Sequence, residues 1–227
     1  YKATFRLTGK TANKNFRLEK EIQIKVYPVV MEEPSLWVTN WFRTSPQKMK
    51  TFNGGKDVEL YSPAYWEMIK ELALKLKECY SNVILISPLQ YIEFIEKDGV
   101  YAFDYTQFDK MISIFKEAGV LKMIEGGHIA GRSGNWDSQF EPYIPEYKDG
   151  KKIMVQYPMA SEKAQNFYKQ FIPSLMAHLK EHKMGEIYAQ HIADEPISSN
   201  IKSYVEIARF VKQQAPEIKI IEACHSH

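Results

Sequence analysis

Ile187-Tyr188-Ala189-Gln190-His191-Ile192-Ala193-Asp194-Glu195-Pro196 is a mostly apolar run that ends in two adjacent carboxylates and a proline. A helical pattern begins a few residues later, at Asn200, so the run predicts a strand followed by a helix. In parallel α/β folds, active sites are built at the carboxyl ends of the strands. Two carboxylates at such an end favour general acid/base chemistry on a sugar or a similar substrate.

Strand-like and helix-like segments alternate on both sides of this stretch. The expected strands are 36–42, 83–87, 122–126, 187–193 and 218–223. Helical spacing of apolar residues predicts helices at 62–79, 108–115, 167–179 and 201–211. Regular alternation with apolar strands is typical of a parallel sheet covered by helices.

Two parallel architectures fit this alternation, part of a barrel and an open sheet. About five β-α units do not complete a (β/α)8 barrel. A doubly wound open sheet is the alternative, but no glycine fingerprint follows the first strand, and Asn53-Gly54-Gly55-Lys56 lacks the spacing of a phosphate-binding loop. We therefore expect an α/β fold with a partial, TIM-like (β/α)8 barrel over residues 35–227.

Residues 1–34 follow a different pattern. Apolar and polar residues alternate over 3–7 and again over 16–26, on either side of a polar turn at 9–15. Period two predicts an antiparallel β-hairpin with one exposed face. One hairpin is marginal alone, so it must pack on something or belong to a larger sheet. A second, inserted hairpin is expected at 91–104, and a long loop at 130–160.

Composition excludes several classes of partner and cofactor. The net charge is +2 and the charges are interleaved without a basic stripe, which argues against a nucleic-acid partner. No apolar run approaches the length of a membrane span. Cys79 and Cys224 have no metal-ligand spacing, and we expect two buried free thiols. The six histidines lack zinc-type spacing, so we expect no metal and no cofactor.

Three motifs occur in order along the chain: Pro34-Ser35-Leu36-Trp37-Val38-Thr39-Asn40-Trp41-Phe42, Tyr65-Trp66-Glu67 and Ile192-Ala193-Asp194-Glu195-Pro196. In this combination the chain resembles glycoside hydrolase family 123, the retaining β-N-acetylgalactosaminidases. The resemblance matches the middle of the family's protein, and it implies that residues 1–34 are the end of a β-sandwich before a catalytic barrel. It also implies a secreted, periplasmic or cell-surface enzyme acting on oligosaccharides or glycoconjugates that end in β-linked N-acetylgalactosamine. No signal peptide is visible in this sequence.

The resemblance implies substrate-assisted retention, in which the sugar's own 2-acetamido carbonyl attacks the anomeric carbon. Asp194 would orient the acetamido group, and Glu195 would protonate the leaving oxygen and then activate water. Adjacent strand residues point to opposite faces, so both carboxylates reach one substrate only if the chain leaves β geometry, a change that Pro196 favours. The alternative for either acid is a cap on the following helix.

Two other functions remain open at this point. One is another retaining barrel glycosidase, with Glu195 as acid/base and its nucleophile on a later strand absent from this sequence. The other is a carbohydrate-binding relative without turnover, because aromatic side chains at a barrel rim bind sugars in either case.

Further substrate contacts are expected where strands end. The candidates are Asn40, Trp41, Gln90, Tyr91, His128 and Trp136. Trp136 and the tyrosines of its loop could form a stacking platform, with loop packing as the alternative. We expect His191 in the core or in support of the site, and Glu125 and Glu222 as buried hydrogen-bonding partners. Unpaired apolar strand edges predict that these 227 residues alone are inactive and either self-associate or aggregate.

Overall fold

The computed structural model describes residues 1–30 and 35–224. The chain divides into two compact units, Tyr1–Pro34 and Ser35–His227. Residues 31–34 and 225–227 lie outside the described part, so the expected boundary after residue 34 and the last residues of the expected barrel segment fall there.

The first unit contains the expected antiparallel hairpin. Strands β1 (Lys2–Lys10) and β2 (Asn15–Gln23) pair along their whole length. The turn is shorter than the polar segment suggests. The Thr11 amide bonds the Lys14 carbonyl at 2.8 Å, and the ladder begins directly beside this turn, with the pair Lys10 and Asn15. Apolar side chains on this hairpin, including that of Phe5, are mostly exposed within the described residues.

A parallel sheet of four strands lies at the centre of the second unit, in the order β11-β10-β6-β3. Its strands are β3 (Val83–Leu85), β6 (Met123–His128), β10 (Tyr188–His191) and β11 (Lys219–Ile220). The four parallel strands lie side by side in the same order in which they occur along the chain. The expected parallel α/β arrangement is therefore present, and the strand order runs without reversal.

The expected first strand, 36–42, is wrong in extent. Only Thr39 forms a parallel bridge, with Val83. The Asn82 side chain explains the difference, because its Oδ1 accepts the Val38 amide at 2.9 Å and its Nδ2 donates to the Leu36 carbonyl at 2.9 Å. These backbone groups are therefore unavailable for a longer ladder.

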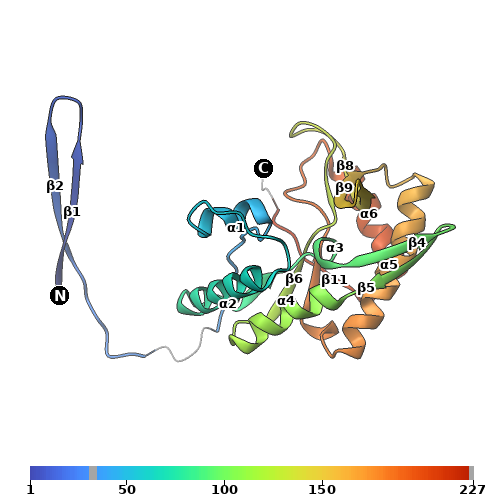
Figure 1. The fold of residues 1–227 in the computed structure, drawn as a ribbon, viewed down its shortest axis with the longest axis horizontal. Helices are drawn as coiled ribbons and strands as arrows, with labels where there is room; N and C mark the ends of the chain where they lie inside the picture. The colour runs from blue at the N-terminus through green and yellow to red at the C-terminus, as the bar shows by residue number, and fades with distance from the viewer. Residues whose placement is uncertain (31–34, 225–227) are drawn as a thin grey trace. The chain divides into compact units, whose positions relative to one another are not determined.

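Helices cover the parallel strands (Figure 1), and the four expected ones are present. The helices are α1 (Pro46–Phe52), α2 (Pro63–Glu78), α3 (Pro88–Tyr91), α4 (Thr106–Glu117), α5 (Glu162–Glu181) and α6 (Ile201–Gln214), with a 3-10 turn η1 (Gly185–Ile187). Ser62 caps α2 and Ser161 caps α5, each accepting the amide three residues on at 3.2 Å. Helix α2 packs beside α4, and α5 beside α6. No helix among the described residues is long and apolar enough to cross a membrane.

Inserted β structure flanks these helices. The expected hairpin consists of β4 (Glu93–Lys97) and β5 (Val100–Asp104). The expected loop at 130–160 is wrong, because it contains the antiparallel strands β7 (Ala130–Arg132), β8 (Phe140–Lys148) and β9 (Lys151–Gln156). Prolines inside β8 obscure the strand in the sequence, and they are tolerated because β7 and β9 pair with different halves of it.

The expectation of buried cysteines is also wrong. Cys79 and Cys224 are free and exposed. Cys79 directly follows α2, and the last buried residue of that helix is Leu76. Cys224 follows the last described strand by several residues, outside the core.

Candidate active site

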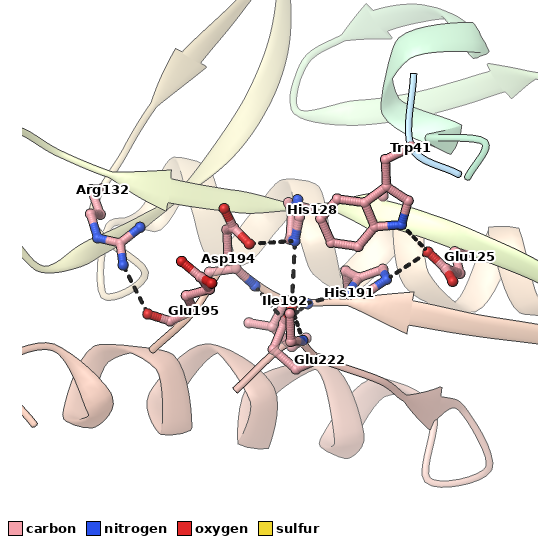
Figure 2. A network of polar contacts seen from close by, with 12 residues as sticks. Trp41, Glu125, His128, Arg132, His191, Ile192, Asp194, Glu195 and Glu222 are labelled. Atoms are coloured by element: carbon pink, nitrogen blue, oxygen red, sulfur yellow. Dashed lines mark hydrogen bonds and ion pairs between the residues drawn. The ribbon is translucent and has the colours of Figure 1, made fainter. Parts of the chain in front are cut away.

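Polar side chains gather at the carboxyl edge of the parallel sheet. Trp41 follows the bridge at Thr39, His128 ends β6, and Glu222 follows β11. Asp194 comes three residues after β10. Figure 2 shows these side chains together, with Glu195 beside Asp194. Because carboxyl ends of parallel strands meet at one edge, four separate segments contribute to one site.

The chain leaves β geometry before the acid pair, as expected. Strand β10 ends at His191, and Glu195 has a φ of 47°. A left-handed conformation at a residue other than glycine costs of order 1–3 kcal/mol and occurs preferentially at functional sites. The Glu195 carbonyl accepts a hydrogen bond from Arg132 Nη2 at 2.8 Å. Neither acid caps α6, whose N-terminal flanking residue is Asn200.

Glu222 anchors the backbone immediately before the acid pair. One of its oxygens accepts the amides of Ile192 at 3.1 Å and Ala193 at 3.0 Å. The other oxygen lies 3.0 Å from His191 Nδ1. The side chain is 5% exposed, so these contacts are shielded from water. Glu222 therefore fixes the backbone of Ile192 and Ala193, immediately before Asp194.

His191 joins Glu222 to a second buried carboxylate. Its Nε2 lies 3.2 Å from Glu125 Oε2, and Trp41 Nε1 donates to the same oxygen at 2.6 Å. Burial alone would lower the pKa of His191, but its hydrogen bonds to Glu125 and Glu222 raise it to about 9. The ring therefore carries a proton on each nitrogen at neutral pH and bridges two carboxylates.

The same contacts keep the carboxylates of Glu125 and Glu222 ionised. Burial alone would raise the pKa of Glu222, but the neighbouring imidazoles of His128 and His191 lower it to about 2. Burial likewise opposes ionisation of Glu125, and the hydrogen bonds from His191 and Trp41 lower its pKa. As expected, both are buried hydrogen-bonding partners, and they bear negative charge beneath the acid pair.

His128 lies between Glu222 and the acid pair. Its Nε2 is 3.4 Å from Glu222 Oε1 and 3.9 Å from Asp194 Oδ1. This atom is buried and makes no hydrogen bond within the described residues. The Trp41 ring meets it edge-on, with centroids 5.5 Å apart, and is itself 45% exposed. His128 and Trp41 thus form the side of the site next to Asp194.

Of the remaining predicted substrate contacts, Trp136 lies near the acid pair, whereas Asn40 and Tyr91 do not. Trp136 is connected to the acid pair through Arg132, whose guanidinium lies 3.8 Å from the centre of the indole ring. Asn40 Nδ2 bonds Ser81 Oγ at 2.6 Å, before the start of β3 and therefore at the other end of that strand from the site. Tyr91 is 2% exposed, and the structure does not bring it to the site.

The environment of Tyr91 explains its position. Its hydroxyl forms a short hydrogen bond with Thr44 and a longer one, 3.4 Å, with Tyr65. Gln90 lies beside this pair, with Nε2 3.4 Å from Thr44 Oγ1. Both residues belong to the short helix α3, in which Tyr91 is buried and Gln90 is half-buried.

The tyrosines of the proposed stacking platform lie on or beside β8 and β9. Tyr147 bonds Glu93, and Tyr157 bonds Glu146, each through its hydroxyl. Tyr143 is half-buried and packs against the core. These contacts fit the alternative of local packing that the sequence left open.

Three donor atoms in the site lie close enough to suggest a metal. One ligand atom from each of His128, His191 and Glu222 lies within 4.8 Å of the others. A metal needs a deprotonated imidazole nitrogen, whereas both nitrogens of His191 bond carboxylates. The group therefore fits a protonated bridge better than a metal centre.

Arg132 is a residue that sequence reasoning missed. It contacts the Glu195 carbonyl, the Trp136 carbonyl and the Trp136 ring. Its segment was expected to be loop, and a single arginine there gives no local signal. The Ile129 and Ala130 amides bond the His191 and Ile192 carbonyls at 3.3 Å and 2.8 Å, and these contacts between distant segments place the start of β7 beside the chain that leads to the acid pair.

Comparisons with known proteins identify the family and a similar fold. A family model described as glycoside hydrolase 123, catalytic domain, matches residues 46–227. Among solved structures, a family 123 glycoside hydrolase from Clostridium perfringens, analysed for glycolipid glycan hydrolysis, is similar with a TM-score of 0.59 and 17% identity. The match covers 99% of this chain and 41% of that chain, so this chain spans less than half of its length. No curated protein sequence matches this chain.

Proposed function

Because the chain belongs to glycoside hydrolase family 123, we propose that the complete protein removes β-linked N-acetylgalactosamine from oligosaccharides or glycoconjugates. The observation that carries the proposal is the adjacent pair Asp194 and Glu195, set at the carboxyl edge of the sheet where the chain leaves β geometry. Such an edge is where α/β enzymes place their reacting groups.

The proposed mechanism is substrate-assisted hydrolysis with retention. The 2-acetamido oxygen forms a bond to the anomeric carbon as the glycosidic bond breaks, and Glu195 gives the leaving oxygen its proton. Glu195 then takes a proton from water as the water oxygen bonds the anomeric carbon and the bond from the acetamido oxygen breaks, so the oxazoline-like intermediate opens. Asp194 accepts a hydrogen bond from the acetamido N–H and stabilises the positive charge that develops on that group.

His128 and Trp41 are proposed to bind the same sugar. The Nε2 atom of His128 lies 3.4 Å from Glu222 and 3.9 Å from Asp194, within reach of a substrate hydroxyl or acetamido group. The exposed face of Trp41 is suited to stack on the apolar face of a sugar or to hold an acetyl methyl group.

We further propose that residues 35–227 are the first part of a (β/α)8 barrel and that residues 1–34 end a preceding β-sandwich. The strand order supports the barrel, because a doubly wound sheet reverses its order at a switch point and this sheet does not. An extracytoplasmic location is proposed on family grounds alone.

The test compares acid-pair variants of the complete protein on aryl β-N-acetylgalactosaminides. Glu195→Gln is expected to slow a substrate with a poor leaving group by about 10²–10⁴-fold, and an activated substrate much less. Asp194→Asn is expected to slow both. Glu186→Gln, a change at a 97% exposed acid, is the matched control. Near-native rates for both acid-pair variants would contradict the assignment.

The mechanism has its own test. A thiazoline that mimics the oxazoline should inhibit strongly, and a β-galactoside without the acetamido group should not be hydrolysed by this route. Comparable kcat/KM for the two sugars would favour a retaining enzyme with a separate protein nucleophile. Sugar binding without turnover by the complete protein would favour a non-catalytic relative.

A further inference from the structure

A second cluster of metal-binding side chains lies outside the candidate active site. Asp109 is in the first turn of α4, and His178 and His182 are at the end of α5. Helix α5 ends before β10 begins, whereas the acid pair follows the end of β10. The two clusters therefore share no residue and no strand end.

The three side chains already meet. His178 Nε2 is 2.7 Å from Asp109 Oδ1, and the rings of His178 and His182 are 4.3 Å apart. One ligand atom from each of the three residues lies within 4.8 Å of the others. Residues four apart lie on one helix face, so both imidazoles point toward the same neighbour.

One ligand is fixed and the others are adjustable. Tyr105 stacks on His178 with ring centres 4.2 Å apart, and its hydroxyl donates to Ser174 at 3.1 Å. His178 is therefore clamped, with a side chain 14% exposed. The Asp109 side chain is 34% exposed and His182 is exposed, which gives an ion a path from solvent and leaves room for water ligands.

We propose that Asp109, His178 and His182 bind a divalent transition-metal ion, of which Zn²⁺ is the best suited, and so join the start of α4 to the end of α5. Two imidazoles and a carboxylate form a common zinc donor set. Helix α5 adds the negative end of its dipole at its C-terminus, which favours a cation there.

The geometry needs only a small adjustment. Tetrahedral donors 2.0–2.2 Å from zinc lie about 3.4 Å apart, so the 2.7 Å contact between Asp109 and His178 must open by about 0.7 Å. Rotation of the half-exposed Asp109 side chain provides this movement. The ion then takes the place of the proton on His178 Nε2, which is released to solvent. One hydrogen bond is thereby replaced by two coordinate bonds, and the exposed ring of His182 is recruited.

The experiment is titration of the metal-free complete protein with Zn²⁺, and with Co²⁺ for its visible absorption, in wild type and in His182→Ala. The variant is expected to lose one bound ion, with an affinity at least 100-fold lower, beyond the 10–100-fold typical of losing an outer contact. Zn²⁺ is also expected to raise the Tm of wild type more than that of the variant.

Two control variants distinguish this site from other histidines. His128→Ala removes a member of the other three-donor group, and His225→Ala/His227→Ala removes the last two histidines of the sequence. Both are expected to keep the ion. Unchanged affinity in His182→Ala, or loss of the ion in either control, overturns the proposal. Because His182 is exposed, its variant is expected to fold, which circular dichroism checks.

Discussion

Replacing Glu222 with glutamine tests the support beneath the acid pair. The carboxylate accepts two backbone amides, from Ile192 and Ala193, and pairs with His191. Glutamine has nearly the same shape, but its amide nitrogen cannot accept a hydrogen bond. At least one buried donor therefore loses its acceptor, and the His191 imidazolium loses one of its two carboxylates.

The expected cost follows from the ionisation of Glu222. Its pKa falls from an ordinary 4.5 to about 2, and each pKa unit corresponds to about 1.4 kcal/mol, which gives about 3 kcal/mol. The raised pKa of His191 describes the same contacts from the other side, so the two shifts are not added. We expect Glu222→Gln to lower the free energy of unfolding by about 2–3 kcal/mol, or the Tm by roughly 4–12 °C.

The effect has a defined pH window. The lowered pKa of Glu222 gives stability that is present above pH 4.5 and is lost as the pH falls toward 2. The raised pKa of His191 gives stability that is present below pH 6.5 and is lost as the pH rises through 9. The difference in stability between wild type and Glu222→Gln should therefore be largest between pH 4.5 and pH 6.5, and it should become smaller at lower and at higher pH.

The assay is thermal unfolding of the complete protein across this pH range, followed by circular dichroism. Glu186→Gln is the matched control, because Glu186 is 97% exposed. If Glu222→Gln matches this control at pH 6, the reasoning about the buried network is wrong. A difference that stays constant from pH 6 to pH 10 would refute the part that concerns His191.

Two further variants test packing and the outer end of the network. Gly126→Ala should lower the free energy of unfolding, measured by chemical denaturation, by about 1–3 kcal/mol. A Cβ at this position would overlap the Tyr188 hydroxyl and lie 2.9 Å from Gln190 Oε1. Wild-type stability of the variant would show that β6 and β10 can move apart. Trp41→Phe should cost about 1–3 kcal/mol by removing the donor to buried Glu125, whereas an unchanged midpoint of unfolding would show that water replaces the indole.

The sequence predicts the features that depend on neighbouring residues. The run before Asp194 is apolar, two acids and a proline follow it, and the helical pattern begins soon after. Strand, turn and helix therefore follow from local periodicity, and the position of the acid pair at a strand end follows with them. The turn at Asp98 and Gly99 is similarly local, because both residues adopt positive φ.

The errors arise where one side chain or one pairing overrides a local pattern. Residues 36–42 read as a strand, but the Asn82 side chain takes the backbone groups that a ladder would use. Residues 130–160 read as a loop because prolines lie within β8, yet each proline has a partner strand on one side only. Neither effect is visible without the three-dimensional neighbours.

The network under the acid pair combines a local signal with a distant one. Glu125 and Glu222 each stand in an apolar strand segment, where a lone carboxylate is costly unless it is paired. That cost predicts a buried partner for each acid but does not identify it. The parallel register supplies the identity, because it aligns His191 with His128 across β10 and β6 and brings β11 alongside. One histidine then pairs with both acids, and Glu222, which follows β11, also holds the backbone immediately before Asp194 and Glu195.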